Sequence, residues 1–422
     1  MKTTKPRRWF QFRLRTLLVL MLLIGIGMGW IAMMRQQASR QRAAGEAIER
    51  LGGVVHWVTD YPEVGLQGQN WFRKLVGDDF FVHPDIVEIR NDAAIEYLTE
   101  VSQVPTLVLI GRQITDAELG HLKGVRDLKT IYFIDTPQVT DDGLRCLMEV
   151  AQLKTLYLSR VSITDAGLEH LRGVRQLDSL SLFGKHLTDA GLEHLEELTQ
   201  LQSLDLGGTQ VTDAGLDHLK GISQLARLNL QHTQITDAGL KHLKGLRHLD
   251  SLYLNGTKLT NAGLAHLKDM TQLQSLDLGN TQVTDAGLEH LKGLTQLQEL
   301  VLVDTPVTGS GLKHLQGVTH LRILDLDGTQ MTDAALEHLE GMTQLEHLRL
   351  TRTQVTDSGL THLSKLTLLQ SLTLGNTRIT DAGLDHLKGL SQLTELRLEN
   401  TQVSDSGVSR LTQALPNCQI LR

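Results

Sequence analysis

Histidine recurs at one position of a regular spacing through most of the chain. Ten histidines stand 24 residues apart, with His121 further upstream: His170, His194, His218, His242, His266, His290, His314, His338, His362 and His386. Histidine binds zinc and titrates near neutral pH, so the column raises the hypothesis of a metal site or a proton-sensitive array. Zinc needs three or four ligands about 2.0 to 2.1 Å from one point, whereas these rings belong to successive repeats. We therefore expect half-buried rings packed between repeats, and no bound metal.

A column of glycines follows the same spacing. Glycine-rich backbone can cradle phosphate, but Ala335 and Glu118 interrupt this column, so a left-handed backbone is not obligatory there. We expect these glycines to allow close packing of turns. They are Gly143, Gly167, Gly191, Gly215, Gly239, Gly263, Gly287, Gly311, Gly359 and Gly383.

The motifs of the common enzyme classes are missing from the sequence. It has no nucleophile elbow, no His-Glu-x-x-His, no P-loop and no Gly-x-Gly-x-x-Gly motif. His56, Asp60, His83 and Asp85 precede the repeats, and isolated residues of these types are usually solvated surface groups. We expect no enzymatic activity and no cofactor.

Composition narrows the remaining classes. Hydrophobic residues make up 41% of the 422 residues but aromatic residues only 4%, so the core must be aliphatic. The net charge of -7 argues against nucleic-acid binding. Cys146 and Cys418 are too few for a disulfide framework, and we expect no bridge between them.

The histidine and glycine columns belong to a repeat of 24 residues, whose strands and helices must position them. Its consensus is LxxLxLxxTxVTDAGLxHLKGLTQ. Leu204 and Leu206 alternate with polar residues, which predicts a strand with one buried face. Asp213, or Thr212 beside it, can cap a short helix beginning at Ala214. A single unit cannot bury its leucines, so the units must stack. Parallel strands pair about 4.8 Å apart and helices pack roughly 8 to 10 Å apart, so the stack curves with its strands inside.

This frame, LxxLxLxxTxVTDxGLxxLxxL, resembles the leucine-rich repeat, in the Thr-Asp-x-Gly-Leu subtype found in F-box substrate receptors. The resemblance covers residues 84–422, about thirteen repeats plus caps. It implies an α/β solenoid, a horseshoe with a parallel concave sheet and convex helices. Where the family often has Asn or Cys, nine consecutive repeats here have Thr, from Thr209 to Thr401. The resemblance implies that a ladder of these hydroxyls satisfies backbone groups of the loops. No F-box precedes the repeats, which argues against a ubiquitin-ligase adaptor.

The N-terminal sequence predicts a membrane-spanning segment. Residues 16–34 carry no charge and would span about 28 Å as a helix, while residues 1–15 are basic and lack acids. The positive-inside rule places a cytoplasmic tail at 1–15, a transmembrane signal anchor at 16–34, and an exported helical and loop connector at 35–83. A cleaved secretory signal is the alternative, and it too exports the repeats. This N-terminus ahead of such repeats is similar to bacterial membrane-anchored leucine-rich repeat proteins.

The positions beside the strand leucines vary while the other columns do not, so we expect the concave face to bind a protein or a cell-envelope ligand. An aromatic and apolar patch is expected near its N-terminal end, acidic residues in the middle and basic residues towards the C-terminus. The candidate ligand-binding residues are Tyr132, Ile134, Tyr157, Phe183, Tyr253, Asp277, Asp325, Arg349 and Arg397. A surface scaffold without a specific ligand is the alternative from another functional class, and an intracellular adaptor of the substrate-receptor type is a third.

Overall fold

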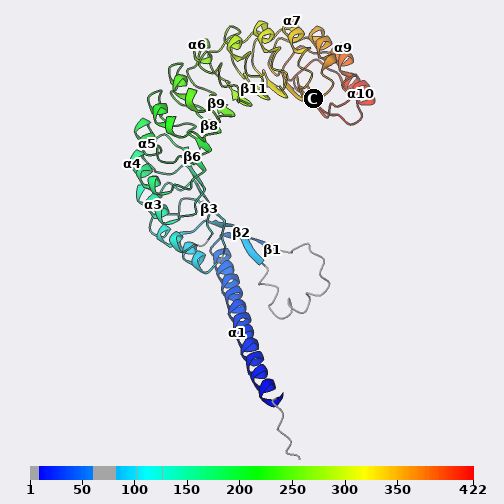
Figure 1. Ribbon diagram of the computed structural model, residues 1–422. Helices are drawn as coiled ribbons and strands as arrows, with labels where there is room; N and C mark the ends of the chain where they lie inside the picture. The colour runs from blue at the N-terminus through cyan, green and yellow to red at the C-terminus, as the bar shows by residue number, and fades with distance from the viewer. Residues whose placement is uncertain (1–8, 60–81, 102, 126) are drawn as a thin grey trace, which may run out of the picture. The chain divides into compact units, whose positions relative to one another are not determined.

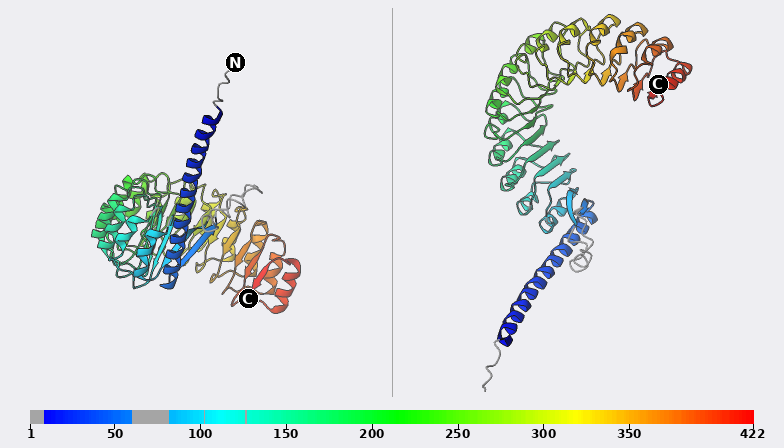
Figure 2. Two further views of the ribbon diagram at one scale, coloured as in Figure 1. Left: turned by 90° about the horizontal axis from the view of Figure 1, so that it is seen from below. Right: turned by 45° about the vertical axis from the view of Figure 1, so that its right-hand side comes forward.

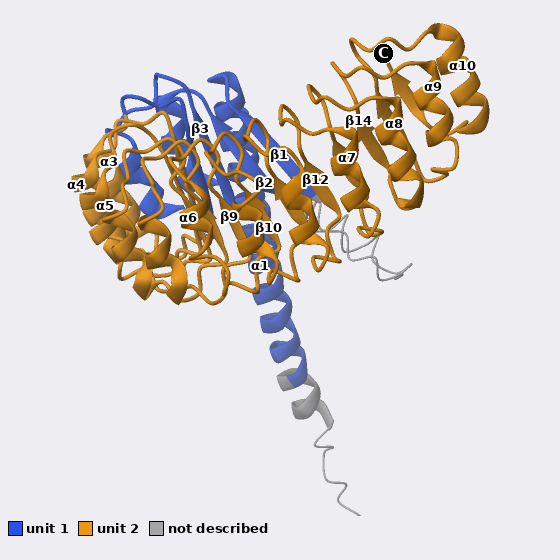
Figure 3. Ribbon diagram, turned by 90° about the horizontal axis from the view of Figure 1, so that it is seen from above, with its two compact units in different colours: residues 1–138 blue, residues 139–422 orange. Residues whose placement is uncertain are grey.

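The computed structural model describes residues 9–59, 82–101, 103–125 and 127–422, with side chains at residues 16–58, 83–101, 103–125 and 127–422. The chain divides into two compact units, unit 1 (Met1–Gln138) and unit 2 (Val139–Arg422), which Figure 3 colours separately. Residues 60–81 of the expected connector, and the first eight residues of the expected basic tail, lie outside the described residues.

Unit 1 contains one long helix followed by strands and short 3₁₀ helices. Strand β1 runs antiparallel to β2, and β2, β3 and β4 are parallel. The elements are α1 (Trp9–Arg50), β1 (Val54–Thr59), β2 (Val82–Ile89), η2 (Asp92–Glu100), β3 (Thr106–Ile110), η3 (Leu119–Gly124) and β4 (Thr130–Ile134), labelled in part in Figure 1.

Helix α1 has two parts with opposite environments. Its C-terminal turns are buried through Gln41, Ala44 and Ile48, and Gly45 lies so close to the ring of Trp57 that a side chain there would collide with it. Helix α1 also contacts η2, whose Ala94, Ile95 and Leu98 are buried, so it covers apolar residues at the N-terminal end of the repeats. The preceding residues leave their apolar side chains exposed, and the segment Thr16–Arg50 is long and apolar enough to cross a membrane.

Unit 2 is a curved stack of parallel strands on the inner edge and short helices on the outer edge (Figures 1 and 2). Each strand pairs in register with the residues 24 positions further along, as Leu276 does with Leu300. The strands are β5 (Thr155–Ser159), β6 (Ser179–Phe183), β7 (Ser203–Asp205), β8 (Arg227–Asn229), β9 (Ser251–Tyr253), β10 (Ser275–Asp277), β11 (Glu299–Val301), β12 (Ile323–Asp325), β13 (His347–Arg349), β14 (Ser371–Thr373), β15 (Glu395–Arg397) and β16 (Gln419–Leu421).

The outer segments are short stretches of α-helix, 3₁₀ helix or both, and the longest is the ten-residue α10. They are α3 (Asp141–Arg145), η4 (Cys146–Glu149), α4 (Asp165–Leu168), η5 (Glu169–Gly173), α5 (Asp189–Glu193), η6 (Gly215–Gly221), η7 (Gly239–Gly245), α6 (Asn261–Leu264), η8 (Gly287–Leu291), η9 (Ser310–Leu315), α7 (Asp333–Leu336), η10 (Glu337–Leu339), α8 (Asp357–Leu360), η11 (Thr361–Lys365), α9 (Asp381–Leu384), η12 (Asp385–Leu387) and α10 (Asp405–Ala414).

The core is the set of leucine columns, with Leu204, Leu206, Leu216 and Leu219 all essentially inaccessible. The threonine column lies beside it. Thr209 Oγ1 donates to the carbonyl oxygen of Leu206 at 2.7 Å, and the same bond recurs in every repeat through Thr401. The expected role in satisfying backbone groups is confirmed, although each hydroxyl acts within its own repeat and the column forms no ladder between repeats.

The Thr-Asp pair divides the two roles that the sequence left open. Thr212 Oγ1 accepts from the amide of Ala214 at 3.4 Å, one residue before η6 begins, and the equivalent bond from Ala190 to Thr188 caps α5. Asp213 reaches into the next repeat, where its carboxylate accepts from the amide of Thr236 at 2.8 Å and from Thr236 Oγ1 at 2.5 Å. A side chain on Gly239 would collide with this carboxylate, which is the close packing that the glycine column predicts.

Candidate recognition surface

The candidate binding residues all lie on strands, beside the buried leucines. Alternation along each strand brings them to the surface that the leucines avoid, which in unit 2 is the concave face. In unit 1, β4 carries Tyr132 and Ile134. In unit 2, the carrying strands are β5 for Tyr157, β6 for Phe183, β9 for Tyr253, β10 for Asp277, β12 for Asp325, β13 for Arg349 and β15 for Arg397.

The aromatic candidates of unit 2 come together on neighbouring strands. Tyr157 on β5 pairs with Ser181 on β6, which is two residues before Phe183. Phe183 itself pairs with Ser159. Phe183 is 48% exposed, and its ring lies over Gly208, where a Cβ would stand 3.2 Å from Phe183 Cε2. A large apolar side chain this accessible is a recognised feature of protein-binding surfaces.

Tyr132 and Ile134 form a separate apolar strip within unit 1. The register places Tyr132 beside Val108 and Ile134 beside Ile110, and all four side chains are partly exposed. The apolar character expected near the N-terminal end of the repeats is therefore present in each unit taken by itself.

The acidic middle of the concave face is already engaged in hydrogen bonds. Asp277 is buried, and its carboxylate accepts from Gln231 Nε2 at 2.8 Å and from the amide of Gly279 at 2.9 Å. Asp205 similarly accepts from the amide of Gly207 at 2.8 Å. Tyr253 lies on β9, which pairs with β8 on one side and with β10 on the other, and it is partly exposed. These internal bonds leave the carboxylates less available to a ligand.

The acidic middle and the basic end also meet each other. Asp325 is only 6% exposed and accepts from the amide of Asp327 at 3.1 Å, while Arg349 Nη1 lies 3.3 Å from its carboxylate. Burial raises the pKa of Asp325, and the negative charge of Asp327 adds to the rise. The hydrogen bond from the Asp327 amide and the positive charge of Arg349 lower the pKa, but the net shift is upward. Arg349 is thus the counter-charge of a buried acid.

Arg397 is paired in the same way. Its Nε lies 2.7 Å from Glu395 Oε1, and this hydrogen bond raises the pKa of Arg397. Ser371 Oγ donates to the other oxygen of Glu395 at 3.2 Å. The basic end that the sequence predicts is therefore a set of exposed arginines whose charges are largely balanced within the sheet.

One cross-repeat ion pair was not predicted from the sequence. Arg352 Nη2 lies 3.1 Å from Asp304 Oδ1, although the two residues are two repeats apart. Both are the third residue after a strand, Asp304 after β11 and Arg352 after β13. The backbone at this position has a positive φ in every repeat from Gly208 to Asn400. Glycine at the intervening Gly328 leaves the space through which the pair meets. The recurrence of Gly and Asn at this position was the signal available in the sequence.

Three histidines of the column contact carboxylates from the preceding repeat. His218 Nδ1 lies 2.6 Å from Glu196 Oε1, His242 Nδ1 lies 2.7 Å from Asp217 Oδ1, and His362 Nδ1 lies 2.9 Å from Glu340 Oε1. Hydrogen bonds from Lys365 and then His362 lower the pKa of Glu340. Within the described part of the chain, no group of three or more His, Cys, Asp or Glu residues is placed to hold a metal ion.

Two family models of the leucine-rich repeat match the chain, one over residues 199–259 and 247–307 and the other over residues 319–339. No curated protein sequence matches it. Among solved structures, it is similar to an internalin from Listeria monocytogenes, with 23% identity, a TM-score of 0.59, and coverage of 78% of this chain and 88% of that one.

A leucine-rich repeat protein of Leptospira interrogans is similar at 19% identity and a TM-score of 0.55, with coverage of 78% of this chain and 91% of that one. At these identities the two structures show the fold alone. The in-register parallel sheet, the outer helical turns and the matched repeats lead to one conclusion. The chain belongs to the leucine-rich repeat family.

Proposed function

We propose that the chain is a single-pass membrane protein that holds its repeats outside the cytoplasmic membrane and binds a protein partner on the concave face. The observation that carries the binding proposal is the exposed ring of Phe183 beside Tyr157. Solenoids of this kind commonly use their concave surface for recognition.

The exposed apolar face of α1 supports the membrane anchor. Leu22 is 64% exposed and Met28 is 67% exposed, and their neighbours from Leu17 to Ile26 are similar. Each square ångström of such surface costs roughly 25 cal/mol in water, a cost that a lipid environment removes. The basic residues upstream of the span support a cytoplasmic N-terminus.

The uneven chemistry of the concave face supports Phe183 as the anchor for a partner. The equivalent position in the following repeats holds Gly207, Gln231 and Asn255, so the phenylalanine is a local departure and not a need of the fold. The charged candidates Asp277, Asp325, Arg349 and Arg397 are each bonded to other residues of the face, whereas Phe183 presents an exposed apolar ring. Aromatic residues of this kind dominate the energetics of protein interfaces.

Site-specific photo-crosslinking tests the proposal in the full-length protein in its membrane. A photoreactive phenylalanine analogue at position 183 should give a protein adduct of one discrete mass, and Tyr157→Ala should reduce its yield. The matched control is the same analogue at Leu368, which is 40% exposed but lies between η11 and β14, off the strands. Equal adducts at both positions would refute the patch, and no adduct at either would favour the ligand-free scaffold.

Topology is tested by protease. Digestion of the repeats after opening of any outer barrier, with the cytoplasmic membrane intact and the mature chain at full mass, is the expected result. Protection until that membrane is lysed would contradict export. Loss of about the first 35 residues from the mature chain would indicate a cleaved signal.

A further inference from the structure

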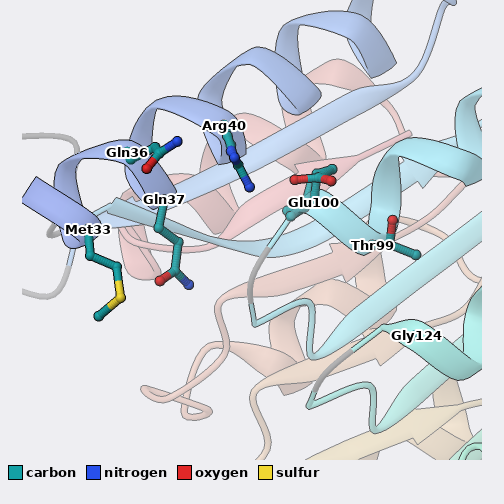
Figure 4. Close-up of a pocket in the computed structure, with 8 residues that line it drawn as sticks. Met33, Gln36, Gln37, Arg40, Thr99, Glu100 and Gly124 are labelled. Atoms are coloured by element: carbon teal, nitrogen blue, oxygen red, sulfur yellow. The ribbon is translucent and has the colours of Figure 1, made fainter.

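A polar groove in unit 1 lies where α1 leaves the repeats. Its walls come from one face of the helix, with Met33, Gln36, Gln37 and Arg40, and from the end of η2, with Thr99 and Glu100 (Figure 4). The helix residues are spaced by three and four, so they share one side of α1. The same side continues into Gln41, Ala44 and Ile48, which are buried against the rest of unit 1. The groove is thus the open continuation of a packed helix interface.

The groove lies at the depth of the lipid head groups if α1 spans the membrane. Met33 is in the last turn of the uncharged stretch 16–34, and Arg40 is about 10 Å further along the helix axis. Side chains on a helix tilt towards its N-terminus, so the long Arg40 side chain is directed back towards the bilayer. The head-group layer is about 5 to 7 Å thick on each side of the hydrocarbon core. Met33 therefore meets acyl chains, and the Arg40 guanidinium reaches the head groups because its side chain extends back from a Cα beyond that layer.

The side chains of the groove match a zwitterionic head group. A guanidinium is the preferred protein partner of a phosphate, and Gln36, Gln37 and Thr99 supply further hydrogen-bond donors. Glu100 supplies a carboxylate on the opposite wall, which suits a primary ammonium and repels a second anion. Met33 offers an apolar contact at the lipid end.

We propose that this groove binds a phospholipid whose head group carries a phosphate and a primary ammonium, as in phosphatidylethanolamine. Arg40 binds the phosphate, Glu100 binds the ammonium, and the acyl chains lie along α1 beside Met33. The proposal rests on the membrane anchor of the proposed function. Its consequence is that a bound lipid holds α1 against the first repeat at the membrane surface.

Native mass spectrometry of the purified full-length protein tests this proposal. The protein is reconstituted in parallel with phosphatidylethanolamine, phosphatidylcholine and phosphatidylglycerol, and the lipid retained after detergent release is counted. We expect one phosphatidylethanolamine to be retained preferentially, and Arg40→Gln to lower this retention about fivefold, as expected for one lost charge-assisted bond. Glu100→Gln should remove the preference over phosphatidylcholine.

The matched control is Arg42→Gln. Arg42 lies two residues away on the same helix, on a different face, and pairs with Glu46. It removes the same charge but should leave lipid retention unchanged. Equal retention by the wild type and Arg40→Gln, or a preference for phosphatidylglycerol, would overturn the groove as a lipid site. If the wild type is instead released from membranes by alkaline carbonate, the anchor itself is wrong, so the two failures are distinguishable.

Discussion

Gly309 and Ala335 are paired departures from the repeat. In most other repeats of unit 2, the side chain of the Asp or Asn that follows the conserved Thr faces a glycine 26 residues later, as Asp333 faces Gly359. At residue 309 the Asp is replaced by glycine, and a Cβ on Gly309 would overlap the Cβ of Ala335. The methyl group of Ala335 therefore fills the space that an aspartate leaves.

This relationship predicts a double-mutant cycle. Gly309→Asp alone should destabilise the full-length protein in detergent by about 2 to 3 kcal/mol, because the new carboxylate meets Ala335. Adding Ala335→Gly should recover only the part of the loss that comes from the contact with Ala335, because Gly309 has a φ of 99°, at which any side chain is strained. The measurement is the urea unfolding midpoint. Additive effects of the two substitutions would show that the positions are independent.

Two substitutions should separate the contribution of hydrogen bonding from that of charge at the Asp side chains that bond to the next repeat. Asp213→Ala removes two bonds to Thr236, and we expect a loss of about 2 kcal/mol in the free energy of unfolding. Asp213→Asn should cost less than half as much, because Asn261 already makes the equivalent bonds to Thr284 at 2.8 Å each. Thermal unfolding of both variants checks this order, and an equal loss from both would assign the effect to charge.

The sequence predicts the fold well because each repeat must satisfy the same packing. The alternation of Leu204 and Leu206 and the glycine at residue 239 each have one physical solution in a stack, and the structure adopts it. The candidate site is predictable only in part. The strand register by itself brings Tyr157 next to the strand that carries Phe183. The hydrogen bond from Arg349 to Asp325 depends instead on side-chain conformation, which the spacing of residues does not determine. Residue spacing cannot distinguish an arginine that is paired from one that is available.

Acid should weaken the repeat interface at Asp285. Burial raises the pKa of this carboxyl, but bonds from Thr308 Oγ1 and from the amides of Gly311, Thr308 and Gly309 outweigh it, so the net pKa lies below its usual value. A lowered pKa in the folded state stabilises the protein above the unfolded value near about 3.9, and this contribution is lost as pH falls through the folded pKa. Asp285→Asn should therefore flatten the fall of the unfolding midpoint below about pH 4. An unchanged slope would exclude Asp285 as its source.

The pair of Asp325 and Arg349 predicts the opposite dependence. The pKa of Asp325 is raised in the folded state, so its relative contribution to stability is present below the unfolded pKa and is lost as pH rises through the folded value. Arg349→Gln removes the counter-charge and should cost about 1 kcal/mol at pH 7, but little at pH 3, where Asp325 is protonated. Arg397→Gln is the control, because Glu395 is not a buried acid. An equal cost at both pH values would show that Arg349 acts by packing alone.

The ion pair between Asp304 and Arg352 requires a glycine between them. Gly328 has a φ of 71°, and a Cβ there would collide with Asp304 and lie 3.1 Å from Arg352 Nη2. Gly328→Ala should therefore cost about 1 to 2 kcal/mol in backbone strain and should also break the pair. Gly341→Ala is the matched control, because nothing lies within 4 Å of the added methyl. If the urea midpoint falls equally in both variants, the loss comes from glycine replacement in general. If Gly328→Ala loses less in the Asp304→Asn background, the excess measures the displaced ion pair.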